Sequence, residues 1–280
     1  IGQADLCRPG LQFAGYFDVF AFERPQVIGK TEMAYLGSLP PNVLDDRLTR
    51  YFSYHIPCII IARSMQCPPA LLEQAQENDV PVYGADEETS IFSAKAITFL
   101  SEALAPRQTC HGVLMDVYGV GLMITGESGV GKSECALELI KHGHQLVTDD
   151  VVDISRVGRT LYGESPEMVR DFIELRGIGI VDVKEIFGIG AIVRRIRIDL
   201  VINLETWHEG KDYDRLGNRE RTMDILGVPL PLIEVPVRPG RSLSTIVEIA
   251  ARNWRLKAEG YDAVVDLDRR LAQHYGRMNE

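Results

Sequence analysis

Short apolar runs alternate with longer segments of helical periodicity in the first hundred residues, and this pattern predicts an α/β unit. Residues 56–62 are almost continuously apolar, as expected of a strand that is covered on both faces. Pro68 and Pro69 open a helical stretch, because a proline in the first turn of a helix loses no hydrogen bond. A second strand at residues 80–83 and an amphipathic helix over residues 87–103 complete the unit, in which no pattern is typical of catalysis. Apolar residues lie near helical spacing in that helix at Ile91, Ala94, Ile97 and Leu104.

Strands dominate from residue 113 onward. Residues 113–117 and 120–125 predict two strands joined by a hairpin at Tyr118 and Gly119, with the glycine at the bend. Further strands are expected at residues 145–148, 151–154, 178–181, 191–204 and 232–237, and helices at residues 134–141 and 242–257, the latter as the last long helix. The polar, proline-containing segment 105–110 is the best candidate for a linker. We therefore expect an N-terminal α/β domain over residues 1–104 and a second domain over residues 111–280.

Composition narrows the class of protein. The 280 residues are 45% hydrophobic and 25% charged, which is typical of a globular chain. The net charge of −10 argues against nucleic acid as the main partner, and no apolar run is long enough for a helix that spans a membrane. Five cysteines without a C-x-x-C pair are typical of buried thiols in a reducing cytoplasm. No signal peptide is visible, and Ile1 in place of Met is consistent with a missing natural N-terminal segment.

Residues 126–133 match the phosphate-loop motif G-x-x-x-x-G-K-[ST], as Gly126, Glu127, Ser128, Gly129, Val130, Gly131, Lys132 and Ser133. The glycines let successive N–H groups point toward phosphate oxygens, and Lys132 adds positive charge toward the β and γ phosphates. The Ser133 hydroxyl is suited to Mg²⁺. An apolar strand precedes the motif and a helix follows it, which is the context that this motif requires. The motif predicts a nucleoside triphosphate and magnesium, but it does not identify the group that receives the phosphoryl.

Two adjacent aspartates, Asp149 and Asp150, end the predicted strand 145–148. Carboxylates at a strand end near a phosphate loop either hold magnesium or act as a base, and a plain strand-to-turn junction is the alternative. Side chains of adjacent residues point to opposite sides of an extended chain. One aspartate is therefore expected to face Mg²⁺ while the other takes a proton from an incoming hydroxyl.

Other charged residues admit both a structural and a functional interpretation. Glu174 and Arg176 lie in an apolar stretch, where they either form a buried salt bridge or provide a metal-binding carboxylate. Several glycines follow and predict tight turns or a close approach to a ligand: Gly177, Gly179, Gly188 and Gly190. His111 and Arg215 are expected in exposed segments, although a mobile arginine also suits the charge of a transferred phosphoryl group. Arg238 and Arg241 flank a turn, where they either bind an anion or only cap it.

In this order, the motifs resemble those of the bacterial HPr kinase/phosphorylase family. The matching segments are His-Gly at 111–112, the phosphate loop with Glu134, Thr-Asp-Asp at 148–150, Glu-Leu-Arg-Gly-Ile-Gly-Ile-Val-Asp at 174–182, Asp-Arg-Leu-Gly at 214–217, and Val-Pro-Val-Arg-Pro-Gly-Arg at 235–241. The resemblance implies an α/β protein, in which a P-loop-containing catalytic domain of the HPr kinase type follows a smaller α/β N-terminal domain. Consistent with this, the sequence has no H-R-D and no D-F-G motif of ordinary protein kinases.

The resemblance also implies an activity. Members of the family use ATP and Mg²⁺ to phosphorylate a serine of HPr, the phosphocarrier of the sugar phosphotransferase system, and thereby regulate carbon metabolism. The same site removes that phosphate with inorganic phosphate and releases pyrophosphate. The expected partners are HPr or a paralogue and other copies of the chain in a homohexamer, and the expected location is the cytoplasm.

The family's residue roles map onto this sequence as follows. Residues 126–133 bind ATP, with Lys132 on the phosphates and Ser133 on Mg²⁺, and Glu174 is the second metal ligand. Asp150 is the base of the kinase reaction and the acid of the reverse reaction, and His111 and Arg215 are active-site residues. The signature segment that serves both reactions contains Ile173, Glu174, Arg176, Gly177, Gly179 and Asp182. The segment that serves dephosphorylation consists of Pro236, Val237, Arg238, Pro239, Gly240 and Arg241.

From the residues alone two other functions stay open. A P-loop enzyme that phosphorylates a small molecule would label that molecule and ignore HPr. A nucleotide-dependent switch would hydrolyse ATP slowly without a protein acceptor.

Overall fold

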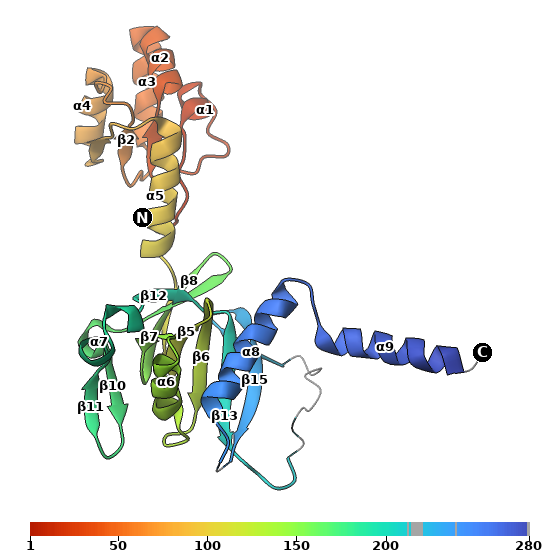
Figure 1. The fold of residues 1–280 in the computed structure, drawn as a ribbon. Coiled ribbons are helices and arrows are strands. Elements are labelled where there is room, and N and C mark those ends of the chain that lie inside the picture. Colours follow the sequence, from red (N-terminus) through yellow and green to blue (C-terminus); the bar gives the residue numbers. More distant parts are fainter. Residues whose placement is uncertain (212, 214–220, 239, 279–280) are drawn as a thin grey trace. The chain divides into compact units, whose positions relative to one another are not determined.

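The apolar patterns of the sequence form separate cores in two units of the chain, residues 1–105 and the residues from 106 onward. Figure 1 shows the computed structural model, which describes residues 1–211, 213, 221–238 and 240–278, with side chains as far as residue 274. The expected α/β class is confirmed in both units.

The first unit is built on a parallel sheet of order β1-β2-β3. Its strands are β1 (Gln26–Ile28), β2 (Ile59–Ile61) and β3 (Val82–Gly84), and its helices are α1 (Gly10–Phe13), α2 (Lys30–Ser38), α3 (Pro41–Phe52), α4 (Pro69–Glu77) and α5 (Thr89–Ala103). Both faces of the sheet are covered, since Ile59 and Ile61 join one core cluster while Ile60 joins another. The apolar run of residues 56–62 is therefore a strand buried on both faces, as predicted.

Helix α5 differs from its prediction in which side it buries. Ile91, Ile97 and Leu104, which we expected on its inner face, are 38–49% exposed. Phe92 packs against the core instead. Because Phe92 lies one position from Ile91, the helix contacts the sheet about 100° away from the stripe that spacing alone suggests.

The second unit contains a six-stranded sheet of order β14-β15-β13-β6-β5-β7, a four-stranded sheet of order β12-β9-β8-β4 and a two-stranded hairpin of β10 and β11. The strands are β4 (Arg107–His111), β5 (Val113–Val117), β6 (Val120–Gly126), β7 (Gln145–Thr148), β8 (Val151–Val157), β9 (Thr160–Glu164), β10 (Phe172–Leu175), β11 (Gly179–Asp182), β12 (Arg195–Arg197), β13 (Leu200–Thr206), β14 (Arg221–Ile225) and β15 (Val228–Val237). The helices are α6 (Lys132–Lys141), α7 (Val183–Phe187), α8 (Leu243–Ala258) and α9 (Ala263–Met278), with short 3-10 turns at Glu167–Val169 and Ile189–Ala191.

Alternating side chains place the large sheet between two different layers. On β6, Leu122 and Ile124 pack into the core that α6 and α8 share, whereas Met123 between them packs against the four-stranded sheet. The same period of two runs along β5, where Val113 and Met115 face the helices and Leu114 faces the other sheet. The strand that leads into the phosphate loop is therefore buried from both sides and held rigidly.

Three sequence-based boundaries need correction. Residues 191–204 are not one strand, because β12 pairs with β9 of the small sheet and β13 pairs with β6 of the large one. Most of the expected linker is strand β4, which pairs with β8. Helix α8 confirms the helix expected at 242–257, but it is not the last one, since α9 follows it.

The crossing between the two sheets is tight at Gly121 on β6. A Cβ atom there would lie 1.7 Å from the carbonyl oxygen of Arg197. Asp199 closes the contact, because its N–H donates to the Gly121 carbonyl over 2.7 Å and its carboxylate accepts from the Gly121 N–H over 3.0 Å. Only glycine allows the chain between β12 and β13 to pass this close.

We expect Gly121→Ala to lower the free energy of unfolding of this unit by about 3 kcal/mol or more, because the methyl group would push two backbone segments apart. Urea unfolding followed by tryptophan fluorescence measures this, since both tryptophans, Trp207 and Trp254, lie in the second unit. Gly190→Ala is the matched control, with open space around the site and ordinary backbone, and it should change the stability little. Equal effects of the two substitutions would contradict the steric argument.

Candidate active site

The carboxyl ends of four strands meet at one edge of the large sheet (Figure 1). Strands β6, β13 and β15 are parallel, and β7 runs the same way because both β6 and β7 are antiparallel to β5. Loops that follow parallel strands collect at this edge, which is where ligands bind in open α/β sheets. The edge therefore collects described residues of four segments that are distant in sequence: 126–133 at the end of β6, 149–150 after β7, 207–211 and 213 after β13, and 238, 240 and 241 after β15.

The phosphate-loop motif joins β6 to α6 as its strand–loop–helix context predicted. Gly126 is required by packing, because a Cβ atom there would lie 2.3 Å from the Leu204 carbonyl oxygen of the neighbouring strand. Gly129 and Gly131 have φ values of 83° and 104°, which favour glycine and turn the backbone into the helix. The first turn of α6 thus directs its free N–H groups and its positive end at the loop.

The Lys132 ammonium lies across this loop. It donates hydrogen bonds to the carbonyl oxygens of Gly126 and Glu127 at 2.9 Å and 3.0 Å. Because an ammonium group has three donors, two bonds to the loop leave it able to contact an anion as well. Among the described residues, Lys132 forms no ion pair with a carboxylate. Its positive charge at the loop is therefore not neutralised there.

The Ser133 hydroxyl donates to both carboxylate oxygens of Asp149, at 2.9 Å and 3.1 Å. Asp149 is only 6% exposed and also accepts the N–H of Glu174 at 3.0 Å. Burial raises the pKa of the Asp149 carboxyl, the bonds from Glu174 and Ser133 oppose this, and the charge of Asp150 adds to it. Such a carboxylate gains from a nearby cation, so the Ser133–Asp149 pair is chemically suited to a hard metal ion.

Asp150 points elsewhere. Its side chain is 74% exposed, and its Oδ1 lies 4.0 Å from Nδ1 of His111, whose side chain is 86% exposed. The two residues are brought together because His111 pairs with Val151 across β4 and β8, and Gly112 N–H donates to the Asp150 carbonyl. Asp150 has a φ of 67°, in the left-handed region, so the chain turns sharply between β7 and β8. The side chains of Asp149 and Asp150 thus point in different directions, as expected, but the cause is a turn of the backbone and not an extended chain.

The β10–β11 hairpin carries the signature residues. Ile173 and Leu175 are buried in the core shared with α6, whereas Glu174 and Arg176 face outward and are exposed. Glu174 and Arg176 therefore do not form the buried salt bridge that we considered, and they do not lie in an apolar environment. The reason is the alternation of side chains along β10, which turns Glu174 to the solvent. Arg176 instead donates to the Ser128 hydroxyl of the phosphate loop at 3.3 Å and lies against Gly129.

The remaining signature residues shape the hairpin. Gly177 and Gly179 have φ values of 83° and 101° at its turn, as tight turning predicted. Asp182 caps α7 by accepting the Glu185 N–H at 2.9 Å, so its position in this structure is that of a helix cap. Gly188 also has a positive φ of 86°, whereas Gly190 has ordinary backbone.

The segment at 236–241 begins as the end of β15, where Pro236 and Val237 pair with β13. Arg238 lies over the ring of Trp207, and Arg241 lines an open hollow of about 490 Å³ with three residues at the start of α8, Ser242, Thr245 and Ile246. Gly240 has a φ of 82°. Arg215 and Pro239, two residues singled out in the sequence, lie outside the described residues.

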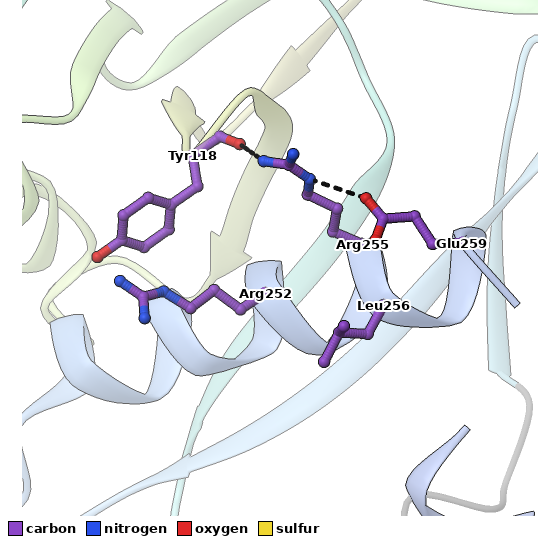
Figure 2. Close-up of a pocket in the computed structure, with 5 residues that line it drawn as sticks. All are labelled: Tyr118, Arg252, Arg255, Leu256 and Glu259. Carbon is purple, nitrogen blue, oxygen red and sulfur yellow. Dashed lines mark hydrogen bonds and ion pairs between the residues drawn. The ribbon is translucent and has the colours of Figure 1, made fainter. Parts of the chain in front are cut away.

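A second hollow, of about 340 Å³, lies away from this edge. Figure 2 shows its lining residues, Tyr118, Arg252, Arg255, Leu256 and Glu259. Arg252 covers the Tyr118 ring, and Arg255 donates to the Tyr118 carbonyl and pairs with Glu259. Because Tyr118 lies in the hairpin before β6, this hollow is at the opposite end of the strand from the phosphate loop.

Sequence reasoning left two features undecided or unseen. It left open whether Asp149 or Asp150 contacts the loop, and the structure decides this by hydrogen bonding and burial. It did not single out Trp207, for which the signal was an aromatic residue directly after a strand of the phosphate-loop sheet. Among the described residues no three metal-ligating side chains form a cluster. No helix in the described part of the chain has the length and apolar character to cross a membrane.

Comparison with known proteins identifies the family. Residues 1–100 match the model for the HPr serine kinase N terminus, and residues 102–271 match that for the HPr serine kinase C-terminal domain. Proteins named HPr kinase/phosphorylase from Thermoanaerobacter sp. (strain X514) and Bacillus subtilis (strain 168) are 47% and 45% identical, over 99% and 97% of this chain and 91% and 88% of their own length. A solved structure of the HPr(Ser) kinase/phosphatase from Coxiella burnetii is 40% identical and covers 57% of this chain and 98% of its own, with a TM-score of 0.52. The chain therefore belongs to the HPr kinase/phosphorylase family of enzymes.

Proposed function

We propose that this enzyme uses ATP and Mg²⁺ to phosphorylate a serine of HPr or a paralogue, and that it dephosphorylates the product with inorganic phosphate, giving pyrophosphate. It would thereby regulate the phosphotransferase system and carbon metabolism. One observation carries the proposal. The phosphate loop and the Ser133–Asp149 hydrogen bond lie at the same edge of the sheet as an exposed carboxylate, that of Asp150, which lies beside His111.

The residues present fit a nucleotide and a magnesium ion. The loop of residues 126–133 offers backbone N–H groups, the helix dipole of α6 and the Lys132 ammonium to phosphate oxygens. Ser133 and Asp149 would hold Mg²⁺ from one side, and Glu174, whose backbone N–H already bonds Asp149, would reach it from the hairpin. When bound, the ion supplies charge neutralisation to the phosphates.

Asp150 is the proposed proton acceptor. Its exposed carboxylate is accessible to a serine hydroxyl on another protein, and it does not share the bonds that hold Asp149 at Ser133. In the kinase direction, Asp150 would take the serine proton as the serine oxygen bonds to the γ-phosphorus of ATP, while the bond from that phosphorus to the β-phosphate oxygen breaks and ADP leaves. In the reverse direction, an oxygen of inorganic phosphate bonds to that phosphorus, the bond to the serine oxygen breaks, and Asp150 returns the proton to serine.

His111 would orient and support Asp150. At 4.0 Å from the carboxylate, a protonated imidazole attracts its charge, while a neutral one still limits the directions it can take. The high exposure of both side chains favours a protein acceptor over a small molecule enclosed in a pocket. This observation disfavours the alternative of a small-molecule kinase.

Inorganic phosphate needs cationic contacts beyond the loop. Arg238 and Arg241 follow β15 at the same edge and are the candidates within the described residues. From its position in the family motif, Arg215 is proposed as a further cationic contact to the phosphate. From the resemblance we also propose that the enzyme acts in the cytoplasm as a homohexamer.

The direct experiment incubates the protein with labelled ATP, Mg²⁺ and purified HPr, and then adds inorganic phosphate. Transfer of label to a serine of HPr, followed by release of labelled pyrophosphate, is the expected result. Labelling of HPr that phosphate does not reverse would contradict the phosphorolytic half of the proposal. ATP hydrolysis that ignores HPr would indicate a switch.

We expect Lys132→Ala to abolish both directions, because both need positive charge at the same phosphates. Lys141→Ala, at the exposed end of the same helix, is the matched control and should retain activity. Assays of HPr phosphorylation and of pyrophosphate release measure the two directions separately. Near-normal activity of the Lys132 variant in either one would show that the loop is not the catalytic centre.

Asp150→Asn should reduce phosphotransfer by roughly 10²- to 10⁴-fold, the usual contribution of a general base, and the reverse reaction should fall as well. Nucleotide binding should change little, since Lys132 and the loop remain. Rapid-quench assays and nucleotide titration measure the two effects. Normal phosphotransfer with weakened magnesium binding would mean that Asp150 acts on the metal and not on the proton.

Asp149→Asn should have the opposite profile, with magnesium-dependent nucleotide affinity reduced about 10-fold or more. Without magnesium the variant should be at least as stable as the native enzyme, because the raised pKa of Asp149 means that its ionised form is disfavoured by folding. The folded state binds this proton more tightly than the unfolded one, so the native enzyme loses stability as pH rises from the ordinary aspartate pKa through the raised one.

The stability advantage of Asp149→Asn should therefore be largest above the raised pKa and shrink as the pH falls through this interval. Thermal unfolding in EDTA at a series of pH values checks this. A variant that is less stable than the native enzyme at neutral pH would show that the hydrogen bonds of the Asp149 carboxylate outweigh the cost of burying its charge.

A further inference from the structure

Trp207 and Arg238 leave the large sheet side by side. Each directly follows one of two paired residues, since Thr206 of β13 is the register partner of Val237 of β15. The Arg238 guanidinium carbon lies 3.2 Å from the centroid of the Trp207 ring. This is well within the range of a cation–π contact, and tryptophan is the strongest aromatic partner for one.

The other face of the indole is covered as well. Tyr213 stacks on Trp207 with ring centroids 4.7 Å apart and an angle of 24° between the planes. A guanidinium and a phenol ring this close to one indole cannot share a face without clashing, so each covers a different one. With both faces occupied, Trp207 has no free surface on which a nucleotide base could stack, and a role in base recognition is disfavoured.

The segment that carries Trp207 is fixed to the sheet. Lys211 pairs with Glu205 of β13 at 2.8 Å and with Glu234 of β15 at 3.3 Å. The His208 N–H donates to the Tyr213 hydroxyl at 3.2 Å. The indole is therefore a half-buried platform held by two strands of the site, and not a ring on a free loop.

The Arg238 guanidinium contacts an aromatic face instead of a carboxylate. Within the described residues it forms no ion pair with a carboxylate, whereas Arg221 and Lys211 nearby are both paired with Glu234. A π face attracts a guanidinium without neutralising it, so its N–H groups stay available to an anion. Arginine also loses much side-chain freedom when it is ordered, and a platform that orders it beforehand lowers that cost on binding.

We infer that Trp207 is a positioning residue, which holds the Arg238 guanidinium in place to bind the phosphate co-substrate of the reverse reaction. This rests on the proposed phosphorolytic function. Trp207 does not contact the reacting atoms and acts only through Arg238. Its removal should therefore weaken phosphate binding more than it slows turnover.

The test compares Trp207→Leu with Trp207→Phe in the full-length enzyme. Leucine keeps apolar bulk but has no π face, so KM for inorganic phosphate in pyrophosphate release should rise roughly 3- to 30-fold, with kcat nearly unchanged. Phenylalanine keeps a π face and should recover most of the affinity. KM for ATP in the kinase direction should stay the same in both variants, and equal thermal stability would exclude general damage.

A double-mutant cycle with Arg238→Ala is decisive. In that background Trp207→Leu should have no further effect on KM for phosphate, because the group it positions is gone. The inference is overturned if Trp207→Leu raises KM equally with and without Arg238, if it lowers kcat in both directions alike, or if phenylalanine behaves as leucine does.

Fluorescence separates this inference from the proposed function. The chain has two tryptophans, so Trp254→Phe leaves Trp207 as the sole emitter. Titration with inorganic phosphate should change its emission saturably, and Arg238→Ala should remove the change. If the enzyme releases no pyrophosphate but the emission still responds through Arg238, the positioning holds and the proposed function fails. If pyrophosphate is released but the emission ignores phosphate, the positioning is wrong.

Discussion

The parallel pairing of β6 with β13 is the constraint on which the candidate site depends. At its end, Gly126 approaches the Leu204 carbonyl so closely that any side chain would separate the two strands. The pairing fixes where the phosphate loop begins and, through β15 on the other side of β13, where Trp207 and Arg238 emerge. Both faces of these strands are packed, by helices α6 and α8 on one side and by the smaller sheet on the other, so little freedom is left to the loops.

Around this frame, two identical residues acquire different chemistry from their surroundings. Burial raises the pKa of the Asp149 carboxyl against the opposing hydrogen bond from Ser133, and this environment suits the carboxylate to a cation. Asp150, one residue later, is exposed because the chain turns through a left-handed conformation between two sheets. The proposed transfer to a serine would use both environments, since charge neutralisation works best away from water, whereas an acceptor serine on another protein can reach only an exposed group.

Arginines at the site are held by groups that do not neutralise them. Arg176 contacts the Ser128 hydroxyl, and Arg238 lies on the Trp207 ring. Other cations of this unit, such as Lys211, Arg221 and Arg197, are paired with carboxylates. Arg176 and Arg238 thus keep N–H groups available to an anion at this edge of the sheet, although the chain as a whole has a net charge of −10.

The sequence by itself determined the features that depend on neighbouring residues. The alternation along 113–117 and 120–125, the glycines and lysine of residues 126–133, and the helix that follows are local patterns, and the structure has each in the expected form. The order of the motifs was sufficient for the family, because the residues that define it lie in short continuous segments.

Tertiary structure alone decided the features that arise from strand pairing. It divided residues 191–204 between two sheets, turned Glu174 and Arg176 outward, buried Asp149 while exposing Asp150, and placed Trp207 under Arg238. Each of these depends on contacts between residues far apart in the chain, and periodicity carries no information about which distant strand will lie alongside.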